Sequence, residues 1–397
     1  MDLAIQDVRR HLGRFLATIA GVSLLVAIVL IMNGIYEGNI GDGVWLINHT
    51  GADLWVVQRN RGGPFNEQSS IPQDTYRSVA AVPGVAQASP FIAYTVERIV
   101  GGHSQQFTVI GYDVFGGLGG PGRLIAGRPI HAAHYEVVAD NKLGLALGAR
   151  IHLGVHDYTV VGLTRDAVDS GGNPLLYLSL PDAQEVLYQR DNEAILQGRA
   201  AALETLLHAG NTPAQAERLA PLLAPSTDTI SAVLVRLAPG VHRKIVAGHI
   251  RSWLYDNVYT TAEERSLMLK GRLRKMTAIL GLFRSLLVLV SLVIIALIMY
   301  VLTIEKIRSI ATLKLIGATQ WVIVRLILEQ ALVLTLSSFG IAYALVHLTA
   351  GKFPRTLVFL PSETVITFAV MLVGGALASG LAIWHALRTP PSAALGG

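Results

Sequence analysis

Few residues in this chain have the types and spacing that catalysis or metal binding requires. His131 and His134 are three residues apart, and His152 and His156 are four apart. Neither pair has a convincing third ligand nearby, so the spacing does not predict a metal site. The glycine-rich segment 116–122 lacks the Lys-Ser/Thr ending of a phosphate-binding loop, and we expect it to be a flexible external loop. No nucleophile or zinc-protease motif is present in the sequence.

The lysines do not form a nucleotide-binding loop. Lys352 alone follows a glycine, and Phe353 stands after it where a Walker A loop has Ser or Thr. We therefore expect no cofactor, including ATP and magnesium, to bind in this chain, and no enzymatic activity of its own. Cysteine is absent, which excludes disulfides, thiolate metal sites and cysteine nucleophiles.

The composition is that of an integral membrane protein. Apolar residue types make up 52% of the chain and charged types 15%, whereas a soluble domain carries about 25% charged residues. A helix needs about 20 apolar residues to cross the hydrocarbon core of a bilayer. Four stretches nearly free of ionisable side chains reach this length, at residues 15–36, 285–304, 330–350 and 364–387. We expect each to be a transmembrane helix, the third beginning at residue 321.

The first apolar stretch is expected to remain in the mature protein. It is longer than the core of a signal peptide, which has about 7–15 apolar residues, and no clear cleavage site follows it. Before it, residues 1–14 place Leu3, Val8 and Leu12 on one helical face, with Arg9 and Arg10 elsewhere. This pattern predicts an amphipathic helix on the inner leaflet. The alternative is a charged topology signal without fixed structure.

Basic residues near the ends of the spans indicate the orientation. They lie before the first span, between the second and third spans, and after the fourth span. If the chain crosses the membrane four times, these three places are on the same side. The residues are Arg9, Arg10, Arg14, Lys306, Arg308, Lys314 and Arg388. We expect that side, with both termini and the tail 388–397, to be the cytoplasm. Residues 37–270 then lie outside, with 18 Lys and Arg against 22 Asp and Glu. Arg272, Arg274 and Lys275 stand on the wrong side for this rule, and the sequence gives no role for them beyond capping a helix.

The external segment is long enough to fold as a domain with its own core. Short alternating or β-branched runs separated by Gly, Asn and Asp fill residues 105–180. Helical patterns flank this part at 73–81, 181–224 and 241–255, and strand patterns stand at 52–58 and 232–237. We expect an α+β domain of two lobes, in which 105–180 is a β-rich insertion. Residues 271–304 are expected to be a stalk and the second transmembrane helix, with helix reaching outward from residue 265.

The loop between the second and third spans, residues 305–320, carries the most informative pattern. Ile307, Ile310 and Lys314 recur at helical spacing, Arg308 adds charge, and Gly317 can end a helix. A short amphipathic helix beneath the bilayer is suited to docking a cytosolic partner. An ordinary basic inner loop is the alternative, and the residue pattern alone favours neither.

This loop resembles the signature of MacB/FtsX-type permeases, the membrane subunits of the mechanotransmission class of ABC transporters. The matching residues are Glu305, Lys306, Arg308, Ile310, Leu313, Lys314, Gly317 and Ala318, with Glu329 further on. Ser309 and Ala311 depart from the family pattern, which has an acidic residue and a glycine there. Segments 124–128, 143–148 and 158–163, and the ending Arg388-Thr389-Pro390-Pro391, also resemble the family. The resemblance therefore runs over most of the chain.

The resemblance implies a bacterial inner-membrane permease with one transmembrane helix before a periplasmic α+β domain and three after it. A separate cytoplasmic ABC ATPase subunit would bind ATP and magnesium. The predicted contacts with that ATPase are Glu305, Lys306, Arg308, Ile310, Leu313, Lys314 and Gly317 of the coupling helix. The resemblance also implies a second permease copy, in a homodimer or heterodimer, a periplasmic adaptor and membrane lipid as partners, and no nucleic acid.

The expected function is to export or extract a lipid, lipopeptide or amphiphilic small molecule by motion of the external domain. Spans without charge favour this over a hydrophilic channel. Two alternatives stay open: an FtsX-like regulator of cell-wall hydrolases, and a lipoprotein-releasing subunit of the LolC/LolE kind. On the fourth span, small residues at four-residue spacing predict close helix packing. These residues are Gly374, Gly375, Ala378, Ser379 and Gly380.

Overall fold

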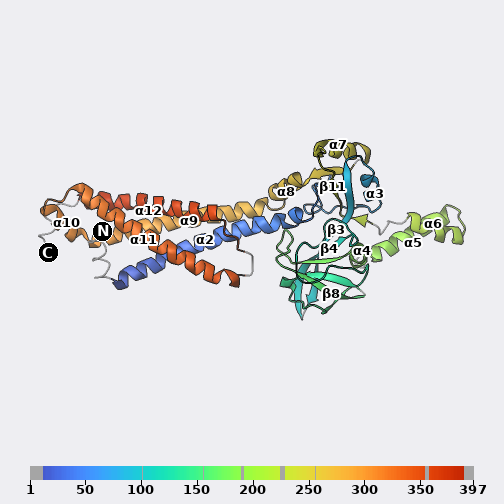
Figure 1. The fold of residues 1–397 in the computed structure, drawn as a ribbon, viewed down its shortest axis with the longest axis horizontal. Coiled ribbons are helices and arrows are strands. Elements are labelled where there is room, and N and C mark those ends of the chain that lie inside the picture. Colours follow the sequence, from blue (N-terminus) through green and yellow to red (C-terminus); the bar gives the residue numbers. More distant parts are fainter. Residues whose placement is uncertain are drawn as a thin grey trace. The chain divides into compact units, whose positions relative to one another are not determined.

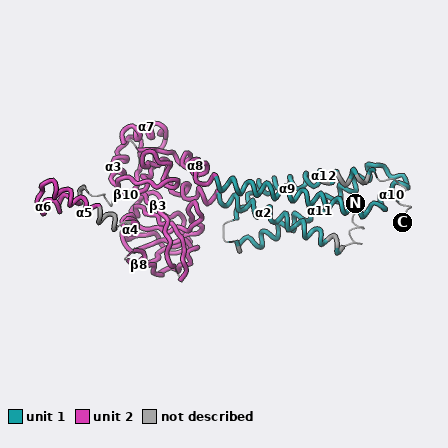
Figure 2. Tube along the Cα trace, turned by 180° about the vertical axis from the view of Figure 1, so that it is seen from behind, with its two compact units in different colours: residues 1–39, 275–397 teal, residues 40–274 magenta. Residues whose placement is uncertain are grey.

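The computed structural model describes residues 12–100, 102–154, 156–188, 192–223, 229–254, 256–353 and 357–388. The chain forms two compact units, residues 1–39 with 275–397 and residues 40–274 (Figure 2). Most of the predicted amphipathic helix at 1–14 and the tail after residue 388 lie outside the described residues.

The first unit is helical and has an apolar core. It contains α2 (Leu12–His49) as far as Asn39, and then α9 (Arg274–Glu305), α10 (Ile307–Leu315), α11 (Gln320–Thr349), the short turn η2 (Ala350–Lys352) and α12 (Pro361–Arg388) (Figure 1). The facing sides of these helices bury a common cluster that includes Val26, Met299 and Leu334.

Within the described residues, three helices have the length and apolar composition to cross a membrane. They are Leu16–His49, Arg274–Glu305 and Gln320–Thr349, and a shorter apolar stretch, Pro361–Leu377, lies in α12. The predicted fold class is confirmed: one membrane helix precedes an α+β domain and three helical spans follow it, the last of them short.

α2 is longer than the sequence predicts. It runs for 38 residues and ends at His49 rather than at residue 36. Its last turns contain glycines and an aspartate, which lower the helix propensity. However, Leu46 and Ile47 are buried in the core of the second unit. Burial of this apolar face stabilises the extra turns, because tertiary packing outweighs propensity.

The predicted continuous stalk from residue 265 is interrupted. α8 (Thr261–Lys270) ends three residues before α9 begins at Arg274. Leu273 lies in the break, buried against α2, where a Cβ added at Gly43 would collide with its side chain. The apolar contact of Leu273 therefore accompanies the break between the two helices.

The second unit is built on one mixed sheet. The strand order is β12-β1-β11-β3-β4-β9-β6-β8-β5, with β7 beside β8. The strands are β1 (Leu54–Val57), β3 (Val85–Val100), β4 (His103–Tyr112), β5 (Leu124–Gly127), β6 (Glu136–Asp140), β7 (Arg150–Leu153), β8 (His156–Thr164), β9 (Leu175–Ser179), β11 (Ala232–Leu237) and β12 (Asn257–Thr260). A separate pair joins β2 (Ile71–Pro72) to β10 (Thr229–Ile230).

Helices cover both faces of the β12-β1-β11-β3 half of the sheet. α3 (Thr75–Ala80) and α7 (Arg243–Leu254) bury Val79 and Ile250 against one face. The end of α2 and α8 bury Ile47 and Met268 with Trp55 on the other. α4 (Leu180–Tyr188) packs Val186 against the second half of the sheet. α5 (Asn192–His208) and α6 (Pro213–Leu223) pack on each other (Figure 1).

The β-rich part is continuous with the rest of the sheet and is not a separate insertion. β3 has 16 residues, and its first half pairs with β11 while Phe91–Val100 pairs with β4. Pro90 interrupts its strand pattern in the sequence and cannot donate a ladder hydrogen bond. For that reason the sequence did not predict β3. The two lobes therefore share one strand.

Candidate functional site

α10 has one face in the core of the first unit and one face in solvent. Ile310 is buried, with 2% of its surface exposed, and Ala311 is buried beside it. Arg308, Ser309 and Thr312 are exposed. Ile310 therefore contacts the core of the first unit and is not accessible to a partner protein in this packing, whereas Arg308 is.

Gly317 ends this helix with left-handed backbone, at a φ of 92°. Its N–H donates to the carbonyl of Lys314 at 3.1 Å, and the N–H of Ala318 donates to Leu313 at 2.9 Å. This pair of bonds is a Schellman motif, which favours glycine because other residues disfavour positive φ. Leu315 and Ile316 then stand exposed at the turn, at 52% and 80%.

Lys314 points into the unit. Its ammonium group donates to the carbonyl oxygen of Leu387, in the last turn of α12, at 2.9 Å. A cation at a helix C-terminus satisfies a carbonyl that the helix leaves open and interacts favourably with the helix dipole. Of the other predicted contact residues, Glu305 is exposed, and Lys306 and Leu313 are partly buried. The predicted set is therefore split between the core and the surface, and its role in ATPase contact stays a prediction.

Some of the small residues of α12 pack closely against other helices, and others do not. A Cβ added at Gly374 would collide with Leu292 of α9, and one at Gly375 would lie 3.0 Å from Oγ1 of Thr335 in α11. Ser379 is buried and donates to the carbonyl of Gly375 at 2.7 Å. No atom lies within 4 Å of a Cβ added at Gly380. The side chain of Ala378 is outside the described part.

Three of the four paired histidines are bound to carboxylates. Nδ1 of His134 lies 2.7 Å from Asp182, Nε2 of His156 lies 2.9 Å from Glu185, and Nδ1 of His152 lies 2.8 Å from Asp157. The first two pairs join the β-rich lobe to α4. Across the described residues, no group of three or more His, Asp or Glu side chains could hold a metal ion.

The glycine-rich segment is packed against the sheet. Gly119 has a φ of 83°, and a Cβ there would lie 2.7 Å from Cδ2 of Phe91. Its N–H donates to the carbonyl of Thr50 at 3.0 Å. Glycine at this position therefore permits close approach to the sheet.

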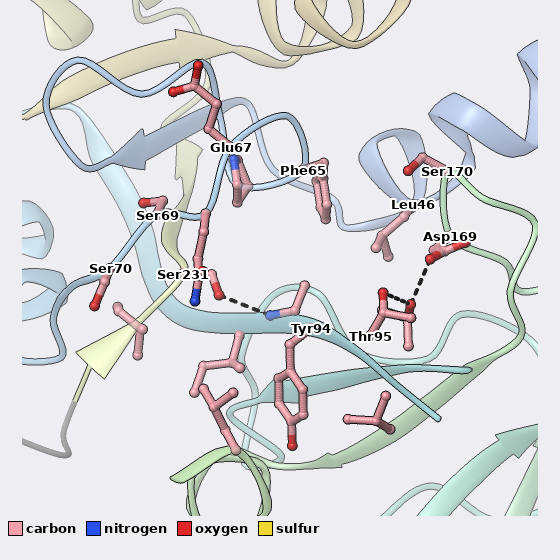
Figure 3. Close-up of a pocket in the computed structure, with 18 of the residues that line it drawn as sticks. Leu46, Phe65, Glu67, Ser69, Ser70, Tyr94, Thr95, Asp169, Ser170 and Ser231 are labelled. Atoms are coloured by element: carbon pink, nitrogen blue, oxygen red, sulfur yellow. Dashed lines mark hydrogen bonds between the residues drawn. The ribbon is translucent and has the colours of Figure 1, made fainter. Parts of the chain in front are cut away.

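The second unit contains a cleft of about 520 Å³ beside the middle of β3 (Figure 3). Its walls are residues 64–70, β3 from Ile92 to Arg98, the loop at 169–170, the end of α4 and residues 229–231. Apolar side chains such as Leu46, Phe65 and Val186 alternate there with hydroxyl groups, including Ser69 and Ser231. Both kinds of surface suit an amphiphilic ligand.

One end of the cleft has an ordered chain of hydroxyl groups leading to a carboxylate. The Thr108 hydroxyl donates to Oδ2 of Asp169 at 2.7 Å, so its oxygen accepts from the Thr95 hydroxyl at 2.9 Å (Figure 3). Asp169 also accepts from the N–H groups of Gly171 and Asn173, both at 2.8 Å. Thr95 therefore directs its oxygen lone pairs, and not its proton, toward other partners.

The opposite wall is held by residues that lead into α9. Nη1 of Arg272 donates to the carbonyl of Phe65 at 2.8 Å, and the Tyr259 hydroxyl donates to the carbonyl of Arg61 at 2.9 Å. Glu264 of α8 is fully buried against Gly63, and its oxygens have no hydrogen-bond partner within the described structure. Burial raises the pKa of Glu264 to about 8. No local pattern predicts this contact of Arg272, because its partner is more than two hundred residues away.

Two family models together match nearly the whole chain. The MacB-like periplasmic core domain matches residues 15–252, and the FtsX-like permease C-terminal domain matches residues 281–391. Two uncharacterized ABC transporter permeases of Mycobacterium tuberculosis (strain ATCC 25618 / H37Rv) are each 23% identical to it, and both alignments cover 99% of each chain.

Two solved structures were also found to be similar. The periplasmic region of MacB from Actinobacillus actinomycetemcomitans has 11% identity and a TM-score of 0.34, covering 54% of this chain and 92% of that one. The extracellular domain of the noncanonic ABC-type transporter YknZ from Gram-positive bacteria has 11% identity and a TM-score of 0.32, covering 53% and 98%. On the family matches, this chain belongs to the MacB/FtsX-like permeases of ABC transporters.

Proposed function

We propose that this permease couples ATP hydrolysis by a separate cytoplasmic ABC ATPase subunit to motion of its extracytoplasmic domain. The motion exports or extracts a lipid, lipopeptide or amphiphilic small molecule. ATP and magnesium are bound by the ATPase and not by this chain. The protein lies in the bacterial inner membrane with both termini in the cytoplasm, and a periplasmic adaptor completes the route.

The observation that carries this proposal is the two-sided structure of α10. Its inner face is fixed to the transmembrane core by Ile310, and Lys314 ties it to the end of α12. Its outer face presents Arg308 and the exposed apolar pair Leu315 and Ile316. Because α10 is packed against the transmembrane helices on one face and exposed on the other, a movement of a docked protein can displace α10 and the helices packed against it. The basic residues at the loop support its cytoplasmic position.

The experiment is co-purification and stimulated ATPase activity. The full-length permease is expressed with an ABC ATPase subunit from the same genome, and ATP hydrolysis by the pair is measured in nanodiscs. We expect a stable complex in which hydrolysis depends on the permease. Hydrolysis by the permease alone, or accessibility of residues 40–274 to a label from the cytoplasmic side, would contradict the proposal.

A second permease copy is part of this proposal, and the exposed face of α9 supports it. Apolar side chains that are at least half exposed follow one another at helical spacing: Ile279, Leu282, Phe283, Leu286, Leu289, Val293 and Leu297. The 32 residues of α9 span about 48 Å, and a bilayer core is about 30 Å thick. The exposed row from Ile279 to Leu297 takes up about 27 Å of that length, so either lipid or a second α9 in a two-fold dimer can cover it.

The absence of cysteine permits a direct test of this dimer. Leu282→Cys gives the chain a single thiol, and oxidative crosslinking in the membrane is expected to yield a disulfide-linked dimer. Leu348→Cys, at a side chain 80% exposed on α11, is the control and should stay monomeric on a denaturing gel. Equal crosslinking at both positions would argue against a contact through α9.

A further inference from the structure

The second half of β3 is an open edge of the sheet, and it lies in the cleft. β11 pairs with β3 only as far as Phe91, whereas β4 pairs with it from Phe91 to Val100. Beyond Phe91, one side of β3 therefore has no neighbouring strand in the described sheet. The cleft is lined by β3 from Ile92 to Val96 and by Arg98, which belong to this unpaired part (Figure 3).

The hydrogen bonds show which backbone groups face this edge. The carbonyl of Phe91 accepts from the N–H of Ser231 at 2.9 Å, and the N–H of Ala93 donates to Oγ of Ser231 at 3.2 Å. Backbone groups alternate between the two sides of a strand. The N–H and C=O of Thr95 and the N–H of Glu97 therefore face the open edge, Thr95 within the cleft and Glu97 beyond it, and no partner for them is found among the described residues. The carbonyl of Glu97 is occupied by the Arg98 guanidinium at 2.9 Å.

The hydrogen-bond donors and acceptors along this edge have the spacing of a peptide backbone. Groups on one side of a strand recur every second residue, about 6.8 Å apart. An acyl chain has no groups to match them, whereas an extended peptide matches each one in turn. An edge of this kind is the surface that proteins use for strand addition, in which backbone bonds give affinity and pockets for side chains give selectivity.

The walls of the cleft indicate the side chains of such a peptide. Leu46 and Phe65 give apolar contact beside Thr95, and Ser69 and Ser231 offer hydroxyl groups. Ser69 is 5% exposed and accepts from the N–H of Gln58 at 3.0 Å, which leaves its proton to donate. The charged residues Glu67, Arg98 and Arg272 also line the cleft, so its walls offer apolar, hydroxyl and charged contacts to the side chains of a bound peptide.

We propose that the cleft binds an extended peptide segment of the transported amphiphile, as an added strand on β3 at Ala93–Glu97. The inference rests on the proposed export function and names its substrate class, a lipopeptide or the peptide end of a lipoprotein. Thr95 is the central residue, because both of its backbone groups face the ligand.

The first test changes the probe and leaves the protein intact. The probe is an N-palmitoylated octapeptide amide of alternating Val and Thr with a fluorescent label, and its partner is the same molecule with every peptide nitrogen methylated. The acyl chain is equal in both, so the two probes differ only at the peptide nitrogens, where a methyl group replaces each hydrogen-bond donor. Loss of a hydrogen bond worth about 1–1.5 kcal/mol weakens binding about tenfold. We expect the methylated probe to bind the full-length permease in nanodiscs at least tenfold more weakly. Equal affinities would overturn the proposal, because the acyl chain alone would then be recognised.

The second test changes the edge. Thr95→Pro removes the N–H that faces the cleft, and proline is tolerated on an open strand edge. Ile99→Pro is the matched control, since residue 99 follows in the same row but does not line the cleft. We expect Thr95→Pro to lose about tenfold in affinity for the unmethylated probe and Ile99→Pro to keep it, with both variants melting as folded proteins. If Thr95→Pro fails to fold, the comparison of the two probes decides alone.

Two further outcomes would count against the proposal. Loss of dimer in Thr95→Pro with unchanged probe binding would assign the edge to a second copy of the chain. Equal loss of binding in both proline variants would mean that proline disturbs the folded domain, and not a contact at Thr95. Binding is measured without an ATPase, so this result does not depend on ATPase coupling. If the peptide fails to bind, the coupling proposal is not affected.

Discussion

The ammonium group of Lys314 lies 2.9 Å from the carbonyl oxygen of Leu387, so the loop between two spans is bonded to the end of a third helix. Lys314→Met removes the charge and the donor but keeps the length of the side chain. A hydrogen bond to a charged group contributes about 1.5–3 kcal/mol, and we expect a loss of about this size in the free energy of unfolding. Thermal melting in detergent should show a lower midpoint, and an unchanged midpoint would contradict the assigned contact.

Arg308 offers the complementary test, because its side chain is exposed and lies outside the core. Arg308→Glu should reduce co-purification of the ATPase subunit about tenfold, or about 1.4 kcal/mol in binding, without lowering the melting midpoint. Arg308→Lys keeps the charge and should retain the complex. Full retention in Arg308→Glu would remove this residue from the docking surface.

Two glycines of α12 allow a matched comparison of helix packing. Gly374→Ile places a side chain where Leu292 already lies, and overpacking of this kind costs about 1–3 kcal/mol. Gly380→Ile meets no atom within 4 Å of its Cβ and should leave stability nearly unchanged. The measurement is the midpoint of thermal aggregation in the same detergent. Equal effects at both positions would contradict the contact between α12 and α9.

Glu264 should make the external domain sensitive to pH. Burial raises its pKa to about 8, whereas a glutamate in an unfolded chain titrates near 4.3. Between these values the folded protein keeps a proton that the unfolded chain has released. The free energy of unfolding contributed by this group therefore falls as pH rises from about 4.5 to about 8, and it is constant above that.

Glu264→Gln should remove this dependence. We expect the variant to melt at a higher temperature than the natural protein at pH 9, and by a smaller margin at pH 5. Glu263→Gln changes an exposed neighbour whose capping contact a glutamine can keep, and it should show no such gain. A margin for Glu264→Gln that is the same at pH 5 and pH 9 would exclude a buried, protonated carboxyl.

Several elements could be predicted from the sequence because their signals are local. Strand Ala232–Leu237 has the predicted bounds, since its apolar run is bordered by turn residues. The end of α10 followed from Gly317, a residue suited to positive φ. The charge-free stretches likewise marked the membrane helices, because the bilayer imposes a length.

The cleft and its edge could not be predicted, because they depend on pairing between distant segments. β3 becomes half-paired because β11, more than a hundred residues later, ends its ladder at Ala232. The burial of Glu264 depends on Gly63, which the sequence places in an unremarked loop. Neither residue has a local pattern that distinguishes it from an ordinary surface glutamate or loop glycine.

The sharing of β3 by both halves of the external domain has a mechanical consequence. A strand of 16 residues that belongs to two pairings cannot slide in one lobe without moving in the other. The two lobes therefore cannot move as independent rigid bodies joined by a flexible linker. We therefore expect a force applied to the β1 and β11 half to reach the backbone groups at Thr95 through β3. The affinity for a bound peptide would then change whenever the sheet is distorted.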